Sequence, residues 1–526
     1  MNSTMQSNGK PQTIVKTLVL TLACGVCLPT VRSAEPHPEW TLYAPNQFGN
    51  TYLIDLNGNV VHTWPSKYRP GESVYLLDDG ALLRTCNDRS VISFGSAGTG
   101  GRLERIAWDG TVQWSYTPGD ENVMPHHDVE VLPNGNILAI VWERYTREEA
   151  IAVGRNPAAT GGWVWSEAIL EIEPSGSTGG NVVWSWHVWD CLVQDFDSQL
   201  PNYGHPADFP GRIDINFGAS IKGDWLHVNG IDYNATLDQI VVCSRFFDEI
   251  WIISHAPGDS GELLYRWGNP QTYGRGSAAD QQLFDPHDPE WIPDGLPGAG
   301  HLTIFNNGGD ERRYSSVDEI APPLNSNGTY DLDVDEPYRP ESLTWTCDAI
   351  DGQRFSSSTL GGFQRLANGN SLICLSRDGR FVEVDDTCST VWSHNIATSV
   401  FRATRIDARD PRLAGLLFYE SKRQTVEEHL KHCLQCQAKL QQLKELKEKL
   451  ASDSQTWRQT ALEDAVFSLI VPRRNEKLNQ DDALIRQSGV WRKIIKSRIT
   501  KLAVTAAIII VVILGLNIIG GRSKSG

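Results

Sequence analysis

The sequence of 526 residues predicts an all-β fold, a six-bladed β-propeller, from about residue 40 to 405. Short apolar alternations are broken there by Asn-Gly or Asp-Gly, which is the turn chemistry of tight β-hairpins. Two kinds of hairpin alternate with a period of about 50 to 60 residues, and a pair of hairpins makes the four strands of one propeller blade. A large β-sandwich is the alternative, but the repeated pair of hairpins has no role in it.

The two hairpin types are recognised by their strands and turns. Hairpins of the first type end at or just after a tryptophan; they read YLIDLNGNVVHTW, LERIAWDGTVQWSY, LEIEPSGSTGGNVVWSW and FVEVDDTCSTVWSH. Hairpins of the second type place a polar or glycine turn between apolar strands; they read VYLLDDGALLRT, VEVLPNGNILAI, GIDYNATLDQIVVCS, EWIPDGLPGAGHLTIF and FQRLANGNSLICLS. The sequence holds 18 tryptophans, and we expect most of them, including Trp114, Trp184, Trp186 and Trp392, to pack in blade cores.

The overall charge excludes one class of partner. The net charge is −17 and the isoelectric point is about 5.2. Binding to nucleic acid needs a basic face that neutralises phosphates. We therefore expect no nucleic-acid partner.

The N-terminal end is typical of an exported protein. An apolar stretch at residues 17–31 follows Lys16 and runs into RSAEP, so residues 1–34 are predicted to be a signal peptide. Cys24 and Cys27 suggest a lipoprotein signal as the alternative, although the residues around them fit that signal poorly. The propeller domain is then expected to span residues 35–415, on the periplasmic or extracytoplasmic side of a membrane.

The C-terminal part has a different composition. Residues 416–455 lack turn residues and carry leucines at helical spacing, which predicts an amphipathic helix. A polar linker is expected at residues 456–501, a single transmembrane helix at residues 502–519 and a short tail at residues 520–526. The basic flank before the span favours a cytoplasmic propeller, which is the alternative topology.

The helical segment also contains a candidate metal site. His429, Cys433 and Cys436 form the pattern H-x3-C-x2-C, and imidazole and thiolate groups at this spacing can reach one zinc ion. The pattern resembles the zinc finger of anti-sigma factors, which implies zinc and a sigma factor as candidate partners of the tail. An unliganded CxxC pair or a buried helical pair is the alternative.

Segments spread over several blades resemble the arylsulfotransferase family. The resemblance covers about residues 40–415, and it implies a six-bladed propeller that needs no nucleotide cofactor. The sequence accordingly lacks a GxxxxGK[ST] phosphate loop. The segments that carry it are HHDVEVLPNGN, DWLHVNGIDYN, SRFFDEIWII, FDPHDPEWIPDG, HLTIFNNGGDER, FQRLANGNSLICLSRDGRFVEV and FRATRIDARDPRLAGL.

The resemblance also implies an active site at the propeller axis. By position, His127, His227, Arg245 and His287 match the catalytic residues of the family, and Asn229 matches the residue beside the second histidine. His126, expected to bind substrate, is the alternative to His127. A His-Asp pair before a hairpin, such as His127–Asp128 or His287–Asp288, is also a structural device of propellers.

These residue types suit sulfuryl transfer between phenols. The reaction needs positioning and charge stabilisation around three equatorial oxygens. Arg245 can bind two of these oxygens, while His127 and His227 bind the third or protonate the leaving phenolate. A neutral His287 would take the group from a phenolic sulfate ester and pass it to an acceptor phenol. The alternative is a non-catalytic propeller that binds a ligand and signals through the tail.

Overall fold

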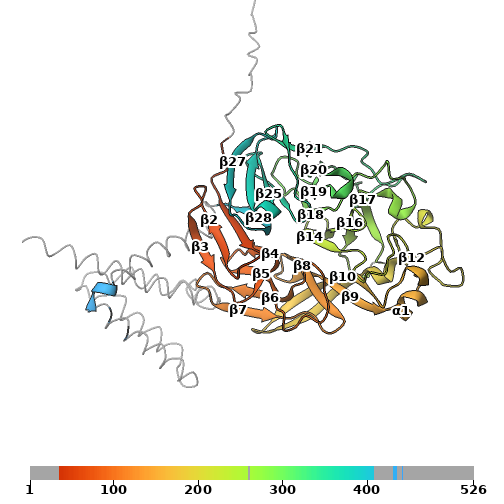
Figure 1. The fold of residues 1–526 in the computed structure, drawn as a ribbon, viewed down its shortest axis with the longest axis horizontal. Coiled ribbons are helices and arrows are strands. Elements are labelled where there is room, and N and C mark those ends of the chain that lie inside the picture. The colour runs from red at the N-terminus through yellow and green to blue at the C-terminus, as the bar shows by residue number, and fades with distance from the viewer. Residues whose placement is uncertain (1–34, 259–260, 408–429, 435–436, 438–440, 442–526) are drawn as a thin grey trace, which may run out of the picture.

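The computed structural model describes residues 35–258 and 261–407, together with residues 430–434, 437 and 441 of the tail. Six four-stranded antiparallel sheets are arranged around an axis (Figure 1). The prediction of an all-β, six-bladed propeller is therefore confirmed.

Five blades are formed by consecutive strands that run from the axis outwards. Each is a pair of hairpins, as the alternating turns predicted. Their strands, blade by blade, are β4 (Arg69–Leu76), β5 (Leu82–Asn87), β6 (Gly101–Ile106) and β7 (Val112–Tyr116); β8 (Val123–Val131), β9 (Ile137–Thr146), β10 (Trp163–Ser175) and β11 (Gly179–His187); β14 (Val228–Asn234), β15 (Gln239–Ser244), β16 (Glu249–Ser254) and β17 (Leu263–Trp267); β18 (His287–Trp291), β19 (Leu302–Asn306), β20 (Ser316–Ile320) and β21 (Trp345–Cys347); β24 (Gly362–Arg365), β25 (Ser371–Leu375), β26 (Arg380–Val384) and β27 (Thr390–Asn395).

The remaining blade closes the ring with strands from both ends of the domain. Strand β28 (Val400–Ile406) pairs antiparallel with β1 (Trp40–Pro45), which is followed by β2 (Thr51–Ile54) and β3 (Val60–Trp64). In this register Trp40 lies opposite Ile406. The innermost strand of this blade is thus the last strand of the domain, and β4, β8, β14, β18, β24 and β28 contact one another in turn around the axis.

Short elements connect or extend the blades. They are the helices α1 (Arg147–Ala152) and α2 (Gly309–Arg312), the 3-10 turns Pro157–Ala159, Val188–Cys191, Pro206–Asp208, Pro270–Tyr273 and Ser376–Asp378, and the strand pairs β12 (Leu192–Val193) with β13 (Ile213–Asp214) and β22 (Ala349–Ile350) with β23 (Gln353–Arg354).

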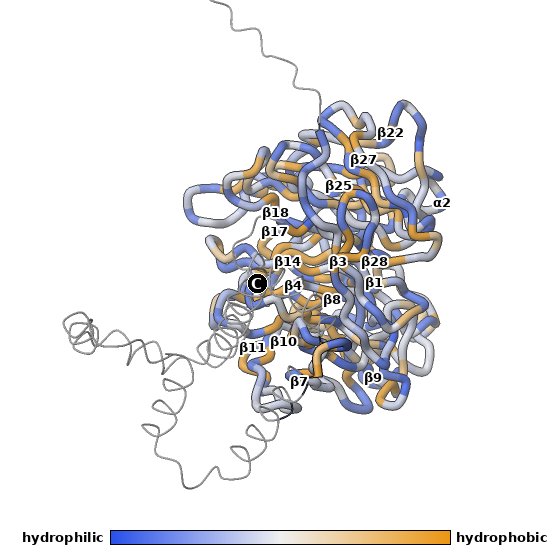
Figure 2. The backbone as a smooth tube through the Cα atoms, turned by 90° about the vertical axis from the view of Figure 1, so that its left-hand side faces the viewer, coloured by the Kyte–Doolittle hydropathy of each residue, from blue (hydrophilic) through white to orange (hydrophobic). Residues whose placement is uncertain are grey.

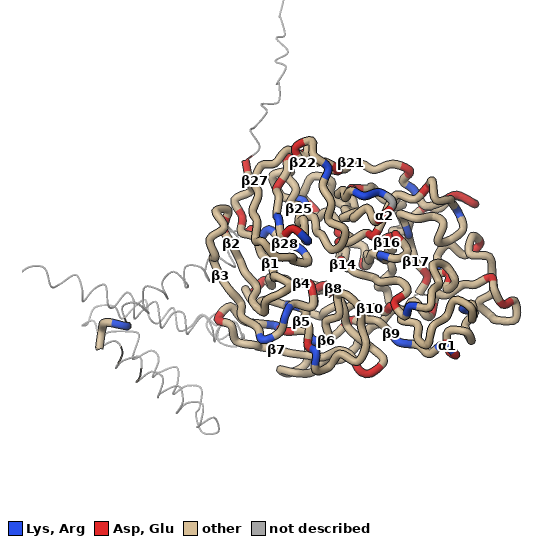
Figure 3. The backbone as a smooth tube through the Cα atoms, in the orientation of Figure 1, with Lys and Arg blue, Asp and Glu red and all other residues tan. Residues whose placement is uncertain are grey.

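The core lies between the blades. Apolar stretches follow the strands, while hydrophilic stretches gather in the outer loops (Figure 2). Trp114 and Trp186 are 4% and 5% exposed and pack in such cores, as predicted. Charged residues lie on the inner strands as well as in the outer loops (Figure 3). The inner charges are the unusual ones, because a buried charge is tolerated only when it is paired.

Several predicted segments lie outside the described residues. These are the signal peptide at residues 1–34, the linker at residues 456–501, the transmembrane segment at residues 502–519 and the tail at residues 520–526. Most of the helical segment at residues 416–455 also lies outside them. Among the residues that the structure describes, no helix has the length and apolar character needed to cross a membrane.

Candidate active site

The centre predicted from the sequence consists of His127, His227, Arg245 and His287. The three histidines lie on or next to the inner strands of neighbouring blades, and Arg245 lies in a turn. His127 lies on β8, His227 directly precedes β14, and His287 is the first residue of β18. The His127 and His227 rings have centroids 4.8 Å apart. The backbone N–H of Arg245, directly after β15, donates to the carbonyl of His227 at 3.1 Å. The structure therefore brings the predicted residues together near the axis.

The backbone is turned sharply where these histidines lie. His127 and His227 have φ of 50° and 52°, in the left-handed region that L-residues with a side chain seldom adopt. The His127 N–H donates to the Gly98 carbonyl at 2.8 Å. A Cβ at position 98 would lie 2.1 Å from His127 Nε2, so only glycine leaves space for the ring. Residues in such conformations persist where the surroundings fix them, often at functional sites.

His287 is held in one tautomer by its neighbours. Its Nδ1 lies 2.7 Å from Asn307 Oδ1. The Asn307 Nδ2 group donates to the carbonyls of Ser357 and Leu360, which fixes Oδ1 as the atom that faces the ring. Nδ1 of His287 must therefore carry the hydrogen, and Nε2 keeps a lone pair. The Leu360 N–H donates to this Nε2 at 3.3 Å, which is a long bond.

The surroundings of His287 also keep it neutral. Burial and the positive charge of Arg245 lower its pKa from 6.5 to about 3, although the hydrogen bond to Asn307 opposes this shift. At neutral pH the ring is thus an unprotonated imidazole with its lone pair on Nε2. A neutral nitrogen with a free lone pair is what nucleophilic catalysis by histidine requires.

His227 and Arg245 are each oriented by a carboxylate. His227 Nδ1 lies 2.6 Å from Asp224 Oδ2, so Nδ1 donates and Nε2 is the second ring nitrogen available for other contacts. Arg245 Nε donates to Asp285 Oδ1 at 3.1 Å, and the Arg245 side chain is 20% exposed. The centre therefore holds a guanidinium with partial access to solvent beside nearly buried imidazoles.

Asn229 and His126 are buried residues next to the centre. Asn229 is fully buried; its Nδ2 donates to the Pro286 carbonyl at 2.9 Å, and its Oδ1 accepts from Cys243 Sγ at 2.7 Å. It ties β14 to the segment that precedes His287. His126 is 1% exposed, stacks on Trp142 with centroids 3.8 Å apart and lies behind His127.

A buried ionic layer contacts the strands that carry the histidines. Arg402 on β28 donates to Asp128 Oδ1 at 2.8 Å and also to Asp288 and to the Tyr75 hydroxyl. Both aspartates follow a centre histidine directly in the sequence. The two His-Asp pairs therefore do not bond internally; their aspartates share one arginine from the strand that closes the ring.

The residues that orient the centre could not be selected from the sequence. Asp224, Asn307 and Asp285 each lie within a segment quoted for the resemblance, but nothing in the spacing indicates which polar side chain meets which ring. Arg402 could not be selected because Asp128 and Asp288 lie on other blades. Glu167 could not be selected because it reaches His126 from another strand of the same blade, 41 residues away in the sequence.

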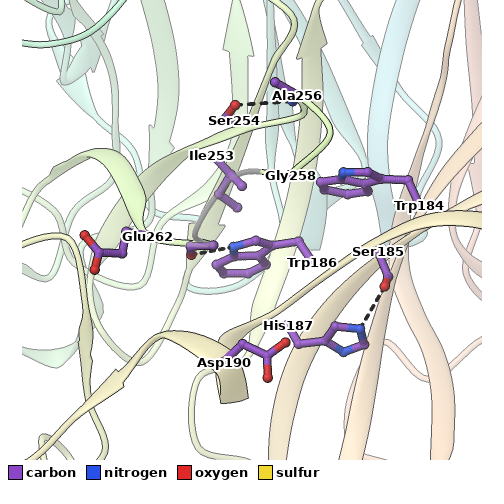
Figure 4. A pocket seen from close by; sticks show the side chains of 11 residues that line it. Trp184, Ser185, Trp186, His187, Asp190, Ile253, Ser254, Ala256, Gly258 and Glu262 are labelled. Atoms are coloured by element: carbon purple, nitrogen blue, oxygen red, sulfur yellow. Dashed lines mark hydrogen bonds between the residues drawn. The ribbon is translucent and has the colours of Figure 1, made fainter. Parts of the chain in front are cut away.

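The structure also contains a cavity of about 220 Å³ at the outer edge of two blades. Trp184, Trp186 and His187 of β11 line it together with Ile253 and Glu262 (Figure 4). None of the four centre residues lines this cavity, so it is a separate surface feature.

Most of the predicted zinc site lies outside the described residues. His429 and Cys436 lie outside the described residues, and only Cys433 of this pattern lies within them. Across the described ranges, no group of three or more His, Cys, Asp or Glu side chains is placed to hold a metal ion.

The six blades and the axial centre of histidines and arginine define a propeller with a polar site at its axis. The sequence matches the family described as Arylsulfotransferase (ASST) over residues 26–410. The chain therefore belongs to the arylsulfotransferase family, which supports a sulfotransferase-type function.

The other comparisons find only distant similarity. No curated protein matches the sequence. A protein of unknown function from Bacteroides caccae is 14% identical with a TM-score of 0.39, over 70% of this chain and 99% of that one. Virginiamycin B lyase from Staphylococcus aureus is 13% identical with a TM-score of 0.33, over 69% and 83% of the two chains. Apo AztD from Citrobacter koseri is 10% identical with a TM-score of 0.34, over 70% and 98%.

Proposed function

We propose that the protein transfers a sulfuryl group from a phenolic sulfate ester to an acceptor phenol through a sulfohistidine at His287, without a nucleotide cofactor. The observation that carries the proposal is the state of His287. Its Nδ1 hydrogen is fixed by Asn307, and burial beside Arg245 lowers its pKa to about 3, which leaves an Nε2 lone pair at neutral pH.

In the first half-reaction, His287 Nε2 attacks the sulfur of the donor. The Nε2–S bond forms, the S–O bond to the donor phenol breaks, and the phenolate leaves with the bonding electrons. Arg245 is placed to bind the sulfuryl oxygens, and His127 or His227 supplies the proton that the phenolate takes up. The long contact from the Leu360 N–H to Nε2 is given up as the new bond forms.

In the second half-reaction, the oxygen of an acceptor phenol attacks the sulfur on His287. The Nε2–S bond breaks and its electrons return to the imidazole as the lone pair. The acceptor loses its phenolic proton in this step. Because the same nitrogen takes and gives the group, the kinetics are ping-pong.

The test is release of nitrophenolate from 4-nitrophenyl sulfate by full-length protein. Without acceptor we expect a burst equal to the enzyme concentration, and with phenol we expect turnover. His287→Ala should abolish both. His301→Ala is the matched control, since His301 lies in the same blade and pairs with Glu319 at 2.7 Å, away from the centre.

Activity that survives in His287→Ala would contradict the sulfohistidine mechanism. No burst from folded protein across a panel of aryl sulfates and acceptors would refute the transferase and favour a propeller that binds a ligand and signals through its tail.

We also propose that the propeller lies on the extracytoplasmic side, anchored by the segment at residues 502–519. The disulfide between Cys347 and Cys388 supports this location, because disulfides persist in oxidising compartments. Zinc binding by His429, Cys433 and Cys436 remains a proposal from the sequence. A sigma factor as partner of the tail belongs to the alternative, cytoplasmic topology, because residues 416–455 precede the anchor and would lie on the same side of the membrane as the propeller. Zinc measured in the purified protein and in a Cys436→Ser variant tests the metal.

A further inference from the structure

A chain of three buried side chains, His127, His126 and Glu167, leads from the centre into the blade formed by β8–β11. Glu167 Oε2 lies 2.9 Å from His126 Nε2, and His126 Nδ1 lies 2.8 Å from His127 Nδ1. The three residues are at most 2% exposed. The second carboxylate oxygen of Glu167 accepts from the Val228 N–H at 3.0 Å. The Glu167 end of the chain is therefore fixed, and the other end is His127 Nε2, the ring nitrogen that does not contact His126.

Each link of this chain holds one proton, because each joins a donor to an acceptor. Two arrangements satisfy both links. In the first, Glu167 is a carboxylate, His126 carries hydrogen on Nε2, His127 carries hydrogen on Nδ1, and His127 Nε2 is an acceptor. In the second, Glu167 is protonated, His126 carries hydrogen on Nδ1, and His127 carries hydrogen on Nε2. The second arrangement contains one proton more and presents a donor.

The surroundings of Glu167 favour storage of the additional proton on its carboxyl group. Burial raises the pKa of Glu167 well above its ordinary value, and the negative charges of Asp224 and Glu143 raise it further. The Val228 N–H opposes this shift. A protonated carboxyl group at this position is neutral, so neither arrangement needs a buried cation.

The histidines of the chain resist protonation to imidazolium. Burial lowers the pKa of both His126 and His127 well below 6.5, and the nearby charge of His227 adds to the effect. His127 also faces His287 and Arg245, which lower its pKa further. A proton accepted at His127 Nε2 is therefore expected to move on rather than to stay as an imidazolium charge.

We propose that Glu167, acting through His126, stores the proton that His127 takes from the acceptor phenol and returns to the leaving phenolate. This role rests on the function proposed above. Glu167 and His126 are positioning residues in this scheme, since only His127 meets the substrate.

The proton balance closes over one cycle. When the acceptor attacks, its phenolic proton passes to His127 Nε2, the Nδ1 proton of His127 passes to His126 Nδ1, and the Nε2 proton of His126 passes to Glu167. The phenol oxygen bonds to sulfur as the bond from sulfur to His287 breaks. When the next donor is cleaved, the three protons move back and the leaving phenolate is protonated.

The decisive variant is Glu167→Gln. Its amide oxygen can still accept from the Val228 N–H, and its amide nitrogen then donates to His126 Nε2. This arrangement holds His127 in the form with hydrogen on Nε2, so the variant can donate a hydrogen bond to the leaving oxygen but has neither a base nor a stored proton. Nitrophenolate leaves as a stable anion, so its release needs no proton transfer. Glu171→Gln is the matched control, because Glu171 lies on the same strand, pairs with His255 Nε2 at 3.0 Å and does not contact the centre.

The measurement separates the half-reactions in full-length enzyme. We expect the nitrophenolate burst of Glu167→Gln to stay within about threefold of wild type, whereas transfer to phenols that are un-ionised at the assay pH falls by about 100-fold, the usual contribution of a general base. Phenols that are already ionised at that pH need no base, and transfer to them should recover. Glu171→Gln should behave as wild type in all three assays.

If Glu167→Gln lowers the rates of both half-reactions equally, or does not selectively slow transfer to un-ionised phenols, Glu167 does not store the proton. Either result is compatible with the sulfohistidine mechanism. Absence of a burst in wild type would refute the proposed function and the proton store with it. If Glu167→Gln does not fold, the rate of a single transfer by the wild-type enzyme is compared in H₂O and D₂O. Transfer to un-ionised phenols must then be slower in D₂O and transfer to ionised phenols must not; no difference in either would overturn the proposal.

Discussion

Arg402 holds together the buried ionic layer beside the histidines, and Arg402→Met removes its charge while keeping a long, unbranched side chain. Asp128 and Asp288 are 0% and 1% exposed at the side chain, so water cannot replace the lost cation. Removal of one partner from a buried ion pair costs about 3–5 kcal/mol. We expect the free energy of unfolding to fall by about that amount at neutral pH.

The loss should depend on pH in a direction that follows from burial. Burial raises the pKa of Asp288, and the charge of Arg402 opposes this shift. Without Arg402 the folded-state pKa rises further above the unfolded value of about 3.9. A carboxyl group with a raised folded-state pKa stabilises the fold at low pH and loses that contribution as the pH rises through the folded-state pKa. The difference in the free energy of unfolding between wild type and Arg402→Met should therefore become smaller as the pH is lowered from neutral.

Guanidinium unfolding of the full-length proteins, followed by tryptophan fluorescence at several pH values, measures both effects. Arg405→Met is the control, because Arg405 lies on the same strand but pairs with Glu383 at 2.8 Å, away from the histidines. It should lower stability and leave sulfuryl transfer by the folded protein unchanged, whereas Arg402→Met should lower both. A loss below about 1 kcal/mol for Arg402→Met, or a deficit that widens as the pH falls, would refute the reasoning.

Two further predictions concern the nucleophile and the disulfide. The rate of the nitrophenolate burst, measured in samples quenched in alkali, should show no inflection near pH 6.5 and should fall only as the pH approaches the His287 pKa of about 3; a loss of rate centred near 6.5 would contradict the buried, neutral imidazole. Replacement of both Cys347 and Cys388 by serine removes a cross-link that spans 41 residues, which the loop-entropy relation values at about 4 kcal/mol. Denaturant unfolding of wild type and the double variant checks this value, and equal midpoints would contradict it.

The blade architecture could be predicted from the sequence because hairpins are local. A turn such as Asn134-Gly135 and the apolar residues on either side of it lie within one short segment, so the pattern shows both strands. The pairing of β28 with β1 could not be read in the same way. It joins Trp40 to Ile406, and no local pattern specifies a partner so distant in the chain.

The same difference between local and long-range information applies to the candidate centre. His127, His227, Arg245 and His287 could be selected because each lies in a segment with a recognisable sequence. Their hydrogen-bond partners depend on which strands become neighbours, as with Glu167, which reaches His126 from β10. The roles of these partners follow from the geometry rather than from residue type.

The closing strand has a consequence for the order in which the chain folds. Long-range pairing is costly in chain entropy, and folds that depend on it form slowly. Until residues 400–406 dock, Asp128 and Asp288 have no cation, so partial rings are penalised by the same carboxylates that hold the finished ring together. Docking of β28 should thus act as the final, cooperative step of assembly. A chain that ends before Val400 should form only an incomplete, inactive ring.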